Sequence, residues 1–518
     1  EEVLGRPGEP GVDVLSIIRA HELPTDFPAE VEQAAEALRA RGVTDADLAG
    51  RENLRDALIF TIDPADARDH DDALSIERVG DGWRVGVHIA DVSHYVAEDS
   101  VIDREAAQRG TSVYLVDRVV PMLPHALSSD ICSLVPDADR LTLSLLVELS
   151  AEADITGSRL VRAVIRSRHK LSYEDAQGVL DGERSVDDPT DAALRELRDV
   201  ARLLREKRSA RGSLDLDLPE ARVVLGESGE PTDIQRVVRL ESHRLIEDFM
   251  LLANEAIARR AIQADVPFIF RVHEPPESGR MEQLRDFAAT FGHRLGGRAG
   301  APTPSDVQRL LAAAEGTPQA SLMSTVVLRS LKQARYSEQS LGHFGLATSS
   351  YTHFTSPIRR YPDLIVHRLC AGLFIDGRTP WLDEERLADI SRHSSERERV
   401  AVAAERDSKD LKKVEFMERH LGADFGGTIS GVTAFGFFVL LDDFFVDGLV
   451  HVSSLDDDYY LFIEEQHALV GERTRRRFRT GDRVRVKVAR VDLEERKIDF
   501  QLLEEKQQRR PARRRTRR

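Results

Sequence analysis

Five aspartates stand within the ten residues 63–72, directly after an apolar run from Ala57 to Ile62. Carboxylates packed this closely repel one another and cannot all ionise at low cost near a protein core. Hard cations among them would relieve that repulsion, and oxygen-only ligands suit Mg²⁺ or Mn²⁺ rather than zinc. The segment is therefore either a metal site for phosphate chemistry or a solvated acidic turn.

Two familiar carboxylate motifs do not match this segment. An EF-hand loop counted from Asp63 would need glycine and glutamate at the positions that hold Arg68 and Leu74. A phosphoaspartyl transferase would need a second aspartate two residues after the strand, but Pro64 and Ala65 follow Asp63. Calcium binding of the EF-hand type and phosphoaspartyl chemistry are both excluded.

The composition is that of a soluble protein with more than one domain. The chain has 518 residues, of which 41% are hydrophobic and 31% charged. No apolar run has the length of a membrane span, and no signal segment follows Glu1. Cys132 and Cys370 are the only cysteines and lack zinc-ligand spacing, so neither disulfides nor a structural metal is expected. We expect a cytoplasmic protein with no membrane partner.

The net charge of −17 argues against a nucleic-acid partner, because phosphate binding depends on lysine and arginine. The distribution of charge argues the other way, since residues 506–518, KQQRRPARRRTRR, are almost wholly basic. Such a segment is typical of a disordered electrostatic arm, the alternative being a solubilising end without function.

Apolar periodicity and Gly/Pro punctuation predict the elements that position these residues. A helix is expected over Pro28–Arg41, ending at Gly42. One long helix is expected over Glu385–Leu421 and joins the body to the last module. The remaining expected strands are Ala57–Ile62, Trp83–Ile89, Leu141–Leu149 and Leu160–Ile165, and the remaining helices are Asp191–Ala210, Glu241–Ala264, Met281–Phe291 and Pro357–Phe374. Helices interleaved with strands indicate an α/β or α+β catalytic body.

The aspartate segment, TIDPADARDHDDA, resembles the signature of the RNB family of 3′→5′ exoribonucleases, which includes RNase II and RNase R. Further segments resemble the family in the same order, over roughly residues 50–400, and the chain looks closest to RNase R. They are Trp83–Val96, Val120–Leu134, Gly212–Glu220, His243–Ala258 and Tyr351–Arg368. Five long, irregular matches make this resemblance much more specific than a single short motif.

The resemblance implies that four of the five aspartates form a Mg²⁺ site, with Mn²⁺ as a substitute, at the end of an RNA channel. It matches Asp63 and Asp72 to direct ligands, Asp71 to the group that holds or deprotonates the attacking water, and Asp69 to the same site. Two ions about 4 Å apart could activate water and stabilise the departing 3′ oxygen. Asp66 lies off the matched positions and is expected at the surface.

A cation should face the metal site, because negative charge develops on the scissile phosphate. Pro357 at a first helical turn would place Arg359 and Arg360 near a helix N-terminus, which favours phosphate binding. Arg359 matches the family's catalytic arginine, whereas Arg360 is either an RNA contact or an ion-pair partner.

Three further residues match RNA contacts of the family. Tyr114 matches the tyrosine that stacks on the 3′-terminal base, and Tyr173 and Glu247 match a pair at the last ribose. Reading the 2′-hydroxyl is how such a site distinguishes RNA from DNA. Where RNase II has a second stacking phenylalanine, this chain offers Val223 or a neighbour.

From about Asp424 the chain resembles an S1-type OB-fold, a five-stranded barrel that binds single-stranded nucleic acid. Phe435, Phe438 and His451 match stacking positions, and Asp492 and Arg496 match the polar edge of that face. For either Phe435 or Phe438, the alternative to base stacking is a place in the barrel core. By alternation along the strand from Phe438, Phe437 should point into that core.

Taken together, these patterns predict an α/β (α+β) RNB catalytic domain followed by an all-β S1-type OB barrel. The predicted function is a processive, hydrolytic 3′→5′ exoribonuclease, a monomer acting on single-stranded RNA with a free 3′ end. A catalytically silent RNA-binding protein and a small-molecule phosphatase are the alternatives. The expected parts are 1–48, a linker and helix after absent cold-shock domains; 49–400, catalytic; 401–423, connecting helix; 424–503, OB domain; and 504–518, basic tail.

Overall fold

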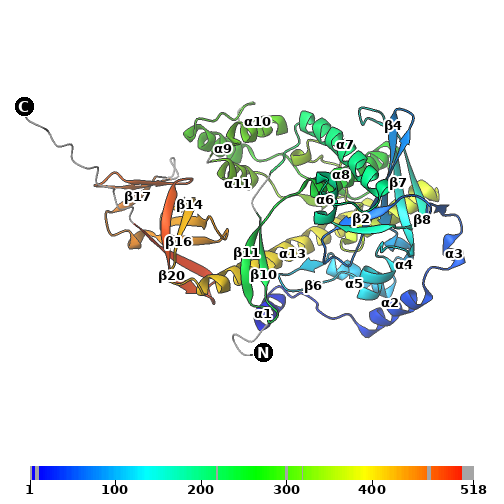
Figure 1. Cartoon of the computed structure of the whole chain (residues 1–518), viewed down its shortest axis with the longest axis horizontal. Helices are drawn as coiled ribbons and strands as arrows, with labels where there is room; N and C mark the ends of the chain where they lie inside the picture. The colour runs from blue at the N-terminus through cyan, green and yellow to red at the C-terminus, as the bar shows by residue number, and fades with distance from the viewer. Residues whose placement is uncertain are drawn as a thin grey trace, which may run out of the picture.

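The structure, a computed structural model, describes residues 3–5, 11–216, 220–297, 301–317, 319–463 and 468–503. It consists of a large mixed α/β body and a smaller β-barrel module, joined by the long helix α13 (Glu384–Glu418) (Figure 1). The predicted basic tail, residues 504–518, lies outside the described residues.

A seven-stranded mixed sheet forms the centre of the large body, in the order β1-β8-β7-β4-β3-β2-β9. The two outer pairs, β1 with β8 and β2 with β9, are parallel, and the others are antiparallel. Its strands are β1 (Glu52–Asn53), β2 (Phe60–Asp63), β3 (Asp72–Val79), β4 (Gly82–Ala90), β7 (Asp139–Leu149), β8 (Ile155–Arg166) and β9 (His169–Ser172). These bounds confirm the four predicted strands.

Helices cover this sheet and bury one continuous apolar core. Helices α7 and α8 pack on each other and against β3 and β4, and α12 packs on α4. The helices of the large body, besides α13, are α1 (Val12–Ala20), α2 (Ala29–Arg41), α3 (Asp45–Leu48), α4 (Val92–Tyr95), α5 (Val101–Arg109), α6 (Tyr173–Asp181), α7 (Asp188–Arg211), α8 (Glu241–Ala264) and α12 (Tyr361–Leu369). Helix α1 was not predicted; it packs against α13.

Three helices with an apolar core of their own lie beside the barrel (Figure 1). They are α9 (Ser278–Thr290), α10 (Pro304–Ala314) and α11 (Ala320–Ser330). Short hairpins complete the body: β5 (Val113–Tyr114) with β6 (Val119–Val120), β10 (Glu220–Leu225) with β11 (Pro231–Val237), and β12 (Phe270–Val272) with β13 (Arg335–Ser337). Short 3₁₀ or π turns are η1 (Leu127–Ile131), η2 (Phe344–Leu346), η3 (Cys370–Ile375) and η4 (Val452–Ser454).

The C-terminal module is a closed five-stranded barrel, in the order β14-β15-β16-β21-β20, with a three-stranded sheet beside it. This confirms the predicted OB-type barrel, and Phe437 is fully buried in it, as the alternation predicted. The barrel strands are β14 (Asp424–Thr433), β15 (Gly436–Leu441), β16 (Asp447–His451), β20 (Arg483–Asp492) and β21 (Lys497–Leu502); the added sheet is β17 (Tyr460–Ile463), β18 (Ala468–Gly471) and β19 (Arg477–Arg479).

One helix of the catalytic body begins later in the chain than predicted. The helix predicted from Pro357 begins only at Tyr361, with Arg360 at its N-cap and Pro362 in its first turn. Residues 357–359 form a turn instead, because Ser356 and Ile358 donate their backbone N–H groups to carboxylates outside any helix. Both cysteines are free and buried.

Among the described residues, no helix is both long enough and apolar enough to cross a membrane.

Candidate active site

Strand pairing brings the aspartates at the two ends of the segment 63–72 together. Asp63 ends β2 and Asp72 begins β3, and these strands are antiparallel neighbours. The eight residues between them form a loop that turns back on itself, and Ala67 donates its backbone N–H to the Pro64 carbonyl. Asp66 is exposed at the outside of this loop, as predicted.

His70 anchors the loop from inside, and the sequence analysis did not identify it. Its ring is buried, and Nδ1 lies 2.7 Å from Oδ2 of Asp63, so Nδ1–H donates to the carboxylate. Its backbone N–H donates to the Ser133 hydroxyl at 3.0 Å, and its carbonyl accepts from Leu134. Held at both backbone and ring, His70 fixes the orientation of the Asp63 carboxylate.

Asp71 occupies the most enclosed position of the cluster. Its Oδ1 accepts the backbone N–H of Ile358 at 2.9 Å, and its Oδ2 lies 3.8 Å from Nε of Arg359. Burial raises the pKa of Asp71 well above its usual range, and Asp69 and Asp72 act in the same direction, whereas Arg359 opposes them. Asp71 thus links the aspartate cluster to the arginine.

The raised pKa of Asp72 shows that the nearby arginines do not offset the burial and the negative charge around this carboxylate. Burial first, and then the neighbouring carboxylate of Asp63, raise the pKa of Asp72 to about 8, while Arg359 and Arg360 oppose the shift. A carboxylate in this environment is anionic at neutral pH only if a further cation stabilises it.

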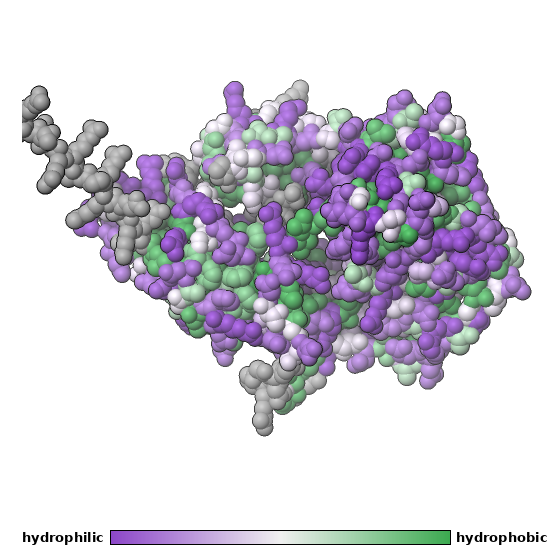
Figure 2. Space-filling model, viewed as in Figure 1, coloured by the Kyte–Doolittle hydropathy of each residue, from purple (hydrophilic) through white to green (hydrophobic). Residues whose placement is uncertain are grey.

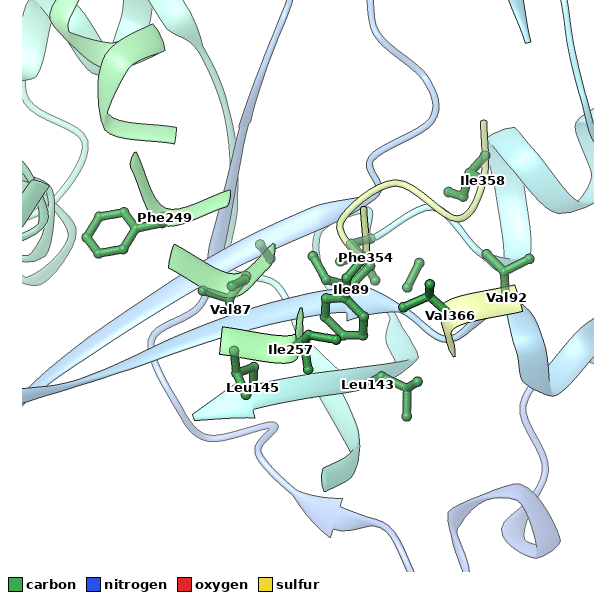
Figure 3. Close-up of a cluster of buried hydrophobic side chains, with 14 of the residues drawn as sticks. Val87, Ile89, Val92, Leu143, Leu145, Phe249, Ile257, Phe354, Ile358 and Val366 are labelled. Carbon is green, nitrogen blue, oxygen red and sulfur yellow. The ribbon is translucent and has the colours of Figure 1, made fainter. Parts of the chain in front are cut away.

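The segment that carries Arg359 is fixed by the apolar core. Phe354 and Ile358 are buried, and Figure 3 shows them above the strand residues Ile89 and Leu143. The Arg359 carbonyl accepts the Ser112 N–H at 2.9 Å, which ties the segment to the strand leading to Tyr114. The guanidinium itself is 40% exposed and donates to the Ser356 hydroxyl, so it remains free to bind a phosphate.

Arg360 belongs to a buried ion pair, which was the alternative interpretation of this residue. Its guanidinium donates to Asp363 at 2.7 Å, and Asp363 also accepts the backbone N–H of Ser356. The side chain is 17% exposed, and the pKa of Arg360 is raised by these neighbours despite its burial. Arg360 lines the cleft but stabilises the arginine segment, so its predicted RNA contact is not the main role that the geometry indicates.

Tyr114 lies beside the aspartates. Its hydroxyl donates to Oδ2 of Asp69 at 3.1 Å, and its partly buried ring lines the cleft. Residues 111 and 360 form a β-bridge, which brings Tyr114 and Arg359 to the same site although they are far apart in sequence.

Tyr173 and Glu247 lie on neighbouring helices at the same cleft. Because β9 runs parallel to β2, Ser172 pairs with Asp63, and Tyr173 begins α6 directly beyond it. The Tyr173 ring stacks on His243 of α8 with centroids 3.9 Å apart, and one turn further along α8 Glu247 forms an ion pair with Arg239. Val223, the position of the second stacking ring in RNase II, is buried in the β10–β11 hairpin and does not line the cleft.

One cleft of about 2400 Å³ extends from the aspartates to the barrel, and it is lined by Asp63, Asp69, Asp71, Asp72, Tyr114, Tyr173, Glu247, Arg359 and Arg360. Figure 2 shows the hollow between the barrel and the large body. Its walls include arginines of α7 that the sequence analysis missed, Arg202, Arg205 and Arg208, which pair with Glu241 and Asp248. Their helical spacing, three residues apart on one face, was the available signal.

The barrel contributes only part of its predicted RNA face to this cleft. Phe438 lines the cleft. Phe435 is 49% exposed, and its ring lies beside the ring of Phe438, with the two centroids 6.3 Å apart. His451 pairs with Gly436 on the neighbouring strand and is exposed. Arg496 lies 3.5 Å from Asp407 of α13 and so forms a contact between barrel and connecting helix, and its RNA contact stays a prediction.

The donor set fits a divalent cation without forming a finished metal site. In the part of the chain that the structure describes, no three His, Cys, Asp or Glu side chains converge into a coordination sphere. The cluster nevertheless offers carboxylate oxygens only, and burial, together with the neighbouring carboxylates, raises the pKa values of Asp71 and Asp72. Hard cations such as Mg²⁺ and Mn²⁺ bind such oxygen ligands.

Known protein families match the chain in the same two parts. Residues 51–374 match the RNB domain, residues 420–502 match the S1 RNA binding domain, and residues 1–28 match a cold shock domain.

Curated relatives and solved structures agree with this division. The chain is 41% identical to Ribonuclease R 1 of Lactococcus lactis, over 97% of this chain and 62% of the relative, and 42% identical to Ribonuclease R of Thermotoga maritima, over 97% and 72%. The structure of Mycoplasma genitalium RNase R in complex with ribose methylated single-stranded RNA superposes with a TM-score of 0.92 at 29% identity, over 97% of this chain and 79% of that one. The chain thus spans about three fifths to three quarters of the length of these curated relatives. With the RNB match covering more than half of its residues, the chain belongs to the RNB family and carries a C-terminal S1 domain.

Proposed function

We propose that the chain is a processive, hydrolytic 3′→5′ exoribonuclease of the RNase R type, acting as a monomer on single-stranded RNA and releasing nucleoside 5′-monophosphates. The observation that carries this proposal is one cleft that joins the aspartates and Arg359 to the barrel face bearing Phe438. A small-molecule phosphatase would not need a cleft that extends from the aspartates to the barrel, because its substrate is small. A catalytically silent RNA-binding protein would not need the buried aspartates beside Arg359, because binding RNA does not require a carboxylate cluster. The cytoplasmic location stays a prediction.

In the proposed reaction, water attacks the last phosphorus, and the bond to the 3′ oxygen of the preceding nucleotide breaks. Asp71 is the residue that orients the water and takes its proton, because one of its oxygens is held by Ile358 N–H and the other faces the cleft beside Arg359. Arg359 neutralises the phosphate oxygens through its planar fork. Mg²⁺ or Mn²⁺, held by Asp63, Asp69 and Asp72, would supply Lewis-acid stabilisation of the phosphate and of the leaving oxygen.

The remaining residues hold the RNA end in this proposal. Tyr114 stacks on the terminal base, while Tyr173 and Glu247 contact the last ribose. Arg239 keeps Glu247 oriented through their ion pair. Phe435, Phe438 and His451 stack on bases further along the strand.

The test is digestion of 5′-labelled single-stranded RNA, and of a duplex with a 3′ overhang, in Mg²⁺ or in EDTA. We expect the full-length RNA to convert to a short 5′-labelled limit product with few intermediates, 5′-monophosphates as the released product, and no reaction in EDTA. Internal fragments, 3′-phosphates or full activity in EDTA would each contradict the proposal.

Replacing Tyr114 by Ala should lengthen the shortest undegraded RNA without stopping hydrolysis of longer RNA. A short end loses its main anchor, since stacking contributes roughly 1–3 kcal/mol per base, whereas a longer RNA keeps its other contacts. The measurement is the length of the limit product on a sequencing gel, with Tyr114→Phe as control. An unchanged limit product in Tyr114→Ala would show that the ring only packs.

Replacing His70 by Phe should weaken Mn²⁺ binding about 10-fold or more, because removing a hydrogen-bond partner of a metal ligand typically has an effect of that size. His70→Asn, whose amide can still donate to Asp63, should lose less. The measurement is a Mn²⁺ titration by electron paramagnetic resonance in the absence of RNA. Equal Mn²⁺ affinity in wild type and His70→Phe would contradict the role assigned to His70.

A further inference from the structure

A second surface of the C-terminal module lies outside the cleft. The barrel residues that line the cleft all fall between residues 428 and 447. The three-stranded sheet β17-β18-β19 lies later in the chain, and none of its described residues lines the cleft. This sheet therefore presents a surface that the proposed active site does not use.

Strand register divides the residues of this sheet between two faces. Phe462 pairs with Leu469 and Leu469 with Phe478, and these three side chains pack in the barrel core. One residue away in each strand, Leu461 pairs with Val470 and Val470 with Arg477, so these side chains point to the opposite face.

Two large side chains are exposed at this face. Leu461 is 49% exposed, and Tyr459, which precedes it by two residues and points the same way, is 69% exposed. We call the surface formed by Tyr459, Leu461 and Arg477, with the exposed Arg475 in the adjoining turn, the Arg–Tyr face. Neither exposed side chain contributes to the core, so folding does not explain their presence.

A carboxylate holds the arginine-rich turn against Tyr459. Asp458 accepts hydrogen bonds from the backbone N–H groups of Arg473 and Thr474 and from the Thr474 hydroxyl. The backbone N–H of Glu472 donates to the Tyr459 carbonyl at 2.8 Å. The turn between β18 and β19 is therefore ordered next to the tyrosine before any ligand binds.

Among the described residues, no carboxylate neutralises Arg475 or Arg477 of this face. Asp457 is occupied by Arg476, at 3.1 Å, and by the Tyr460 hydroxyl, at 3.0 Å. Arg475 and Arg477 are exposed, and among the described residues neither has a carboxylate within ion-pair distance. Two exposed guanidinium groups without a carboxylate partner in the described part of the chain are unexpected in a protein whose net charge is −17.

We propose that the Arg–Tyr face is a second RNA-binding surface, which holds single-stranded RNA on the 5′ side of the segment in the cleft. Guanidinium forks bind phosphates, and the Tyr459 ring offers a base a stacking surface that is tolerant of sequence. The inference rests on the proposed function for the identity of the polymer.

The charge and ring favour RNA over the other partners that an exposed face can take. A lipid surface is bound by basic residues together with a broad apolar face, and among the described residues of this face the large exposed apolar side chains are Tyr459 and Leu461 alone. A phosphate polymer needs only spaced cations with rings between them, which is what β17 and β19 provide.

The experiment compares two RNAs that share a 3′ end, one of about 10 nucleotides, within the ~4–16 nucleotides that one OB-fold covers, and one of about 40. Affinities of the full chain are measured in EDTA over a salt series. The variants are Arg475→Glu with Arg477→Glu, the milder Arg475→Gln with Arg477→Gln, and Tyr459→Ala. The matched control is Arg259→Glu with Arg399→Glu, two exposed arginines of the large body that also lack an ion pair among the described residues.

We expect the glutamate pair to weaken binding of the long RNA about tenfold at low salt and to reduce the salt slope by about 1.4, since each phosphate contact to a single strand contributes about 0.7. Tyr459→Ala should weaken binding of the long RNA about fivefold, the lower end of one stacking contact. The short RNA should bind all variants equally well.

Unchanged binding of the long RNA by both arginine pairs, or an equal loss in the matched control, overturns the proposal. So does a loss of binding to vesicles of anionic lipid while RNA affinity stays the same, which would assign the face to a membrane. If the double variant Arg475→Glu with Arg477→Glu does not fold, as judged by its unfolding temperature, the binding of the long RNA by Arg475→Gln with Arg477→Gln decides between these outcomes. Hydrolysis of the short RNA in Mg²⁺, measured in parallel, tests the exoribonuclease proposal separately.

Discussion

Replacing Asp71 by Asn should lower the single-turnover rate of RNA hydrolysis by on the order of 10³-fold, within the range attributed to a general base. The amide keeps the shape of the side chain and can keep the contact with Ile358 N–H, but it cannot take a proton or compensate a cation. RNA affinity should stay near that of wild type, because the variant removes one negative charge from a crowded cluster and no RNA contact.

The measurement is pre-steady-state decay of end-labelled RNA with enzyme in excess, together with RNA affinity in EDTA. Asp66→Asn is the matched control, since Asp66 belongs to the same loop but is exposed and lies 3.8 Å from Arg222 rather than in the cluster. Decay of Asp71→Asn within tenfold of wild type would rule out the role assigned to this carboxylate.

Replacing Arg359 by Lys should lower the same rate about 100-fold, the cost typical of losing one preorganised donor to a developing negative charge. Lysine keeps the charge but loses the planar fork that can contact two phosphate oxygens at once. Because the segment is fixed by Phe354 and Ile358 in the core, the rest of the site should stay in place (Figure 3).

Arg329→Lys serves as its control, because Arg329 also lines the cleft, on α11, away from the aspartates. It should change the single-turnover rate little. A rate for Arg359→Lys within threefold of wild type would show that charge alone matters at this position. An equal loss in Arg329→Lys would show that the effect is not specific to Arg359.

The sequence predicted most of the elements that position the site. Apolar periodicity placed the helix over Glu241–Ala264 with the bounds that the structure has. It also placed α13 and α2 within a few residues of their observed ends. Such elements are predictable because their apolar pattern is local and long. Alternation around Phe437 likewise identified a buried barrel position, since successive side chains of a strand point to opposite faces.

The family signature identified the aspartates and Arg359, but it could not show how they are held. His70 is one letter within the motif, and only the fold places its Nδ1 2.7 Å from Asp63. The helix expected from Pro357 begins later, because Asp363 and Asp71 hold the backbone N–H groups of Ser356 and Ile358. Pairings between residues so distant in sequence leave no periodic signal.

What the sequence determined by itself was the set of chemical groups and the strands and helices that carry them. What only the tertiary structure decided was which group each charged side chain faces. Arg360 pairs with Asp363, Arg496 lies beside Asp407, and Arg475 and Arg477 remain without partners among the described residues. An arginine has the same intrinsic charge in all three settings, and the free energy of that charge depends on burial and on the nearest carboxylate, which long-range packing sets.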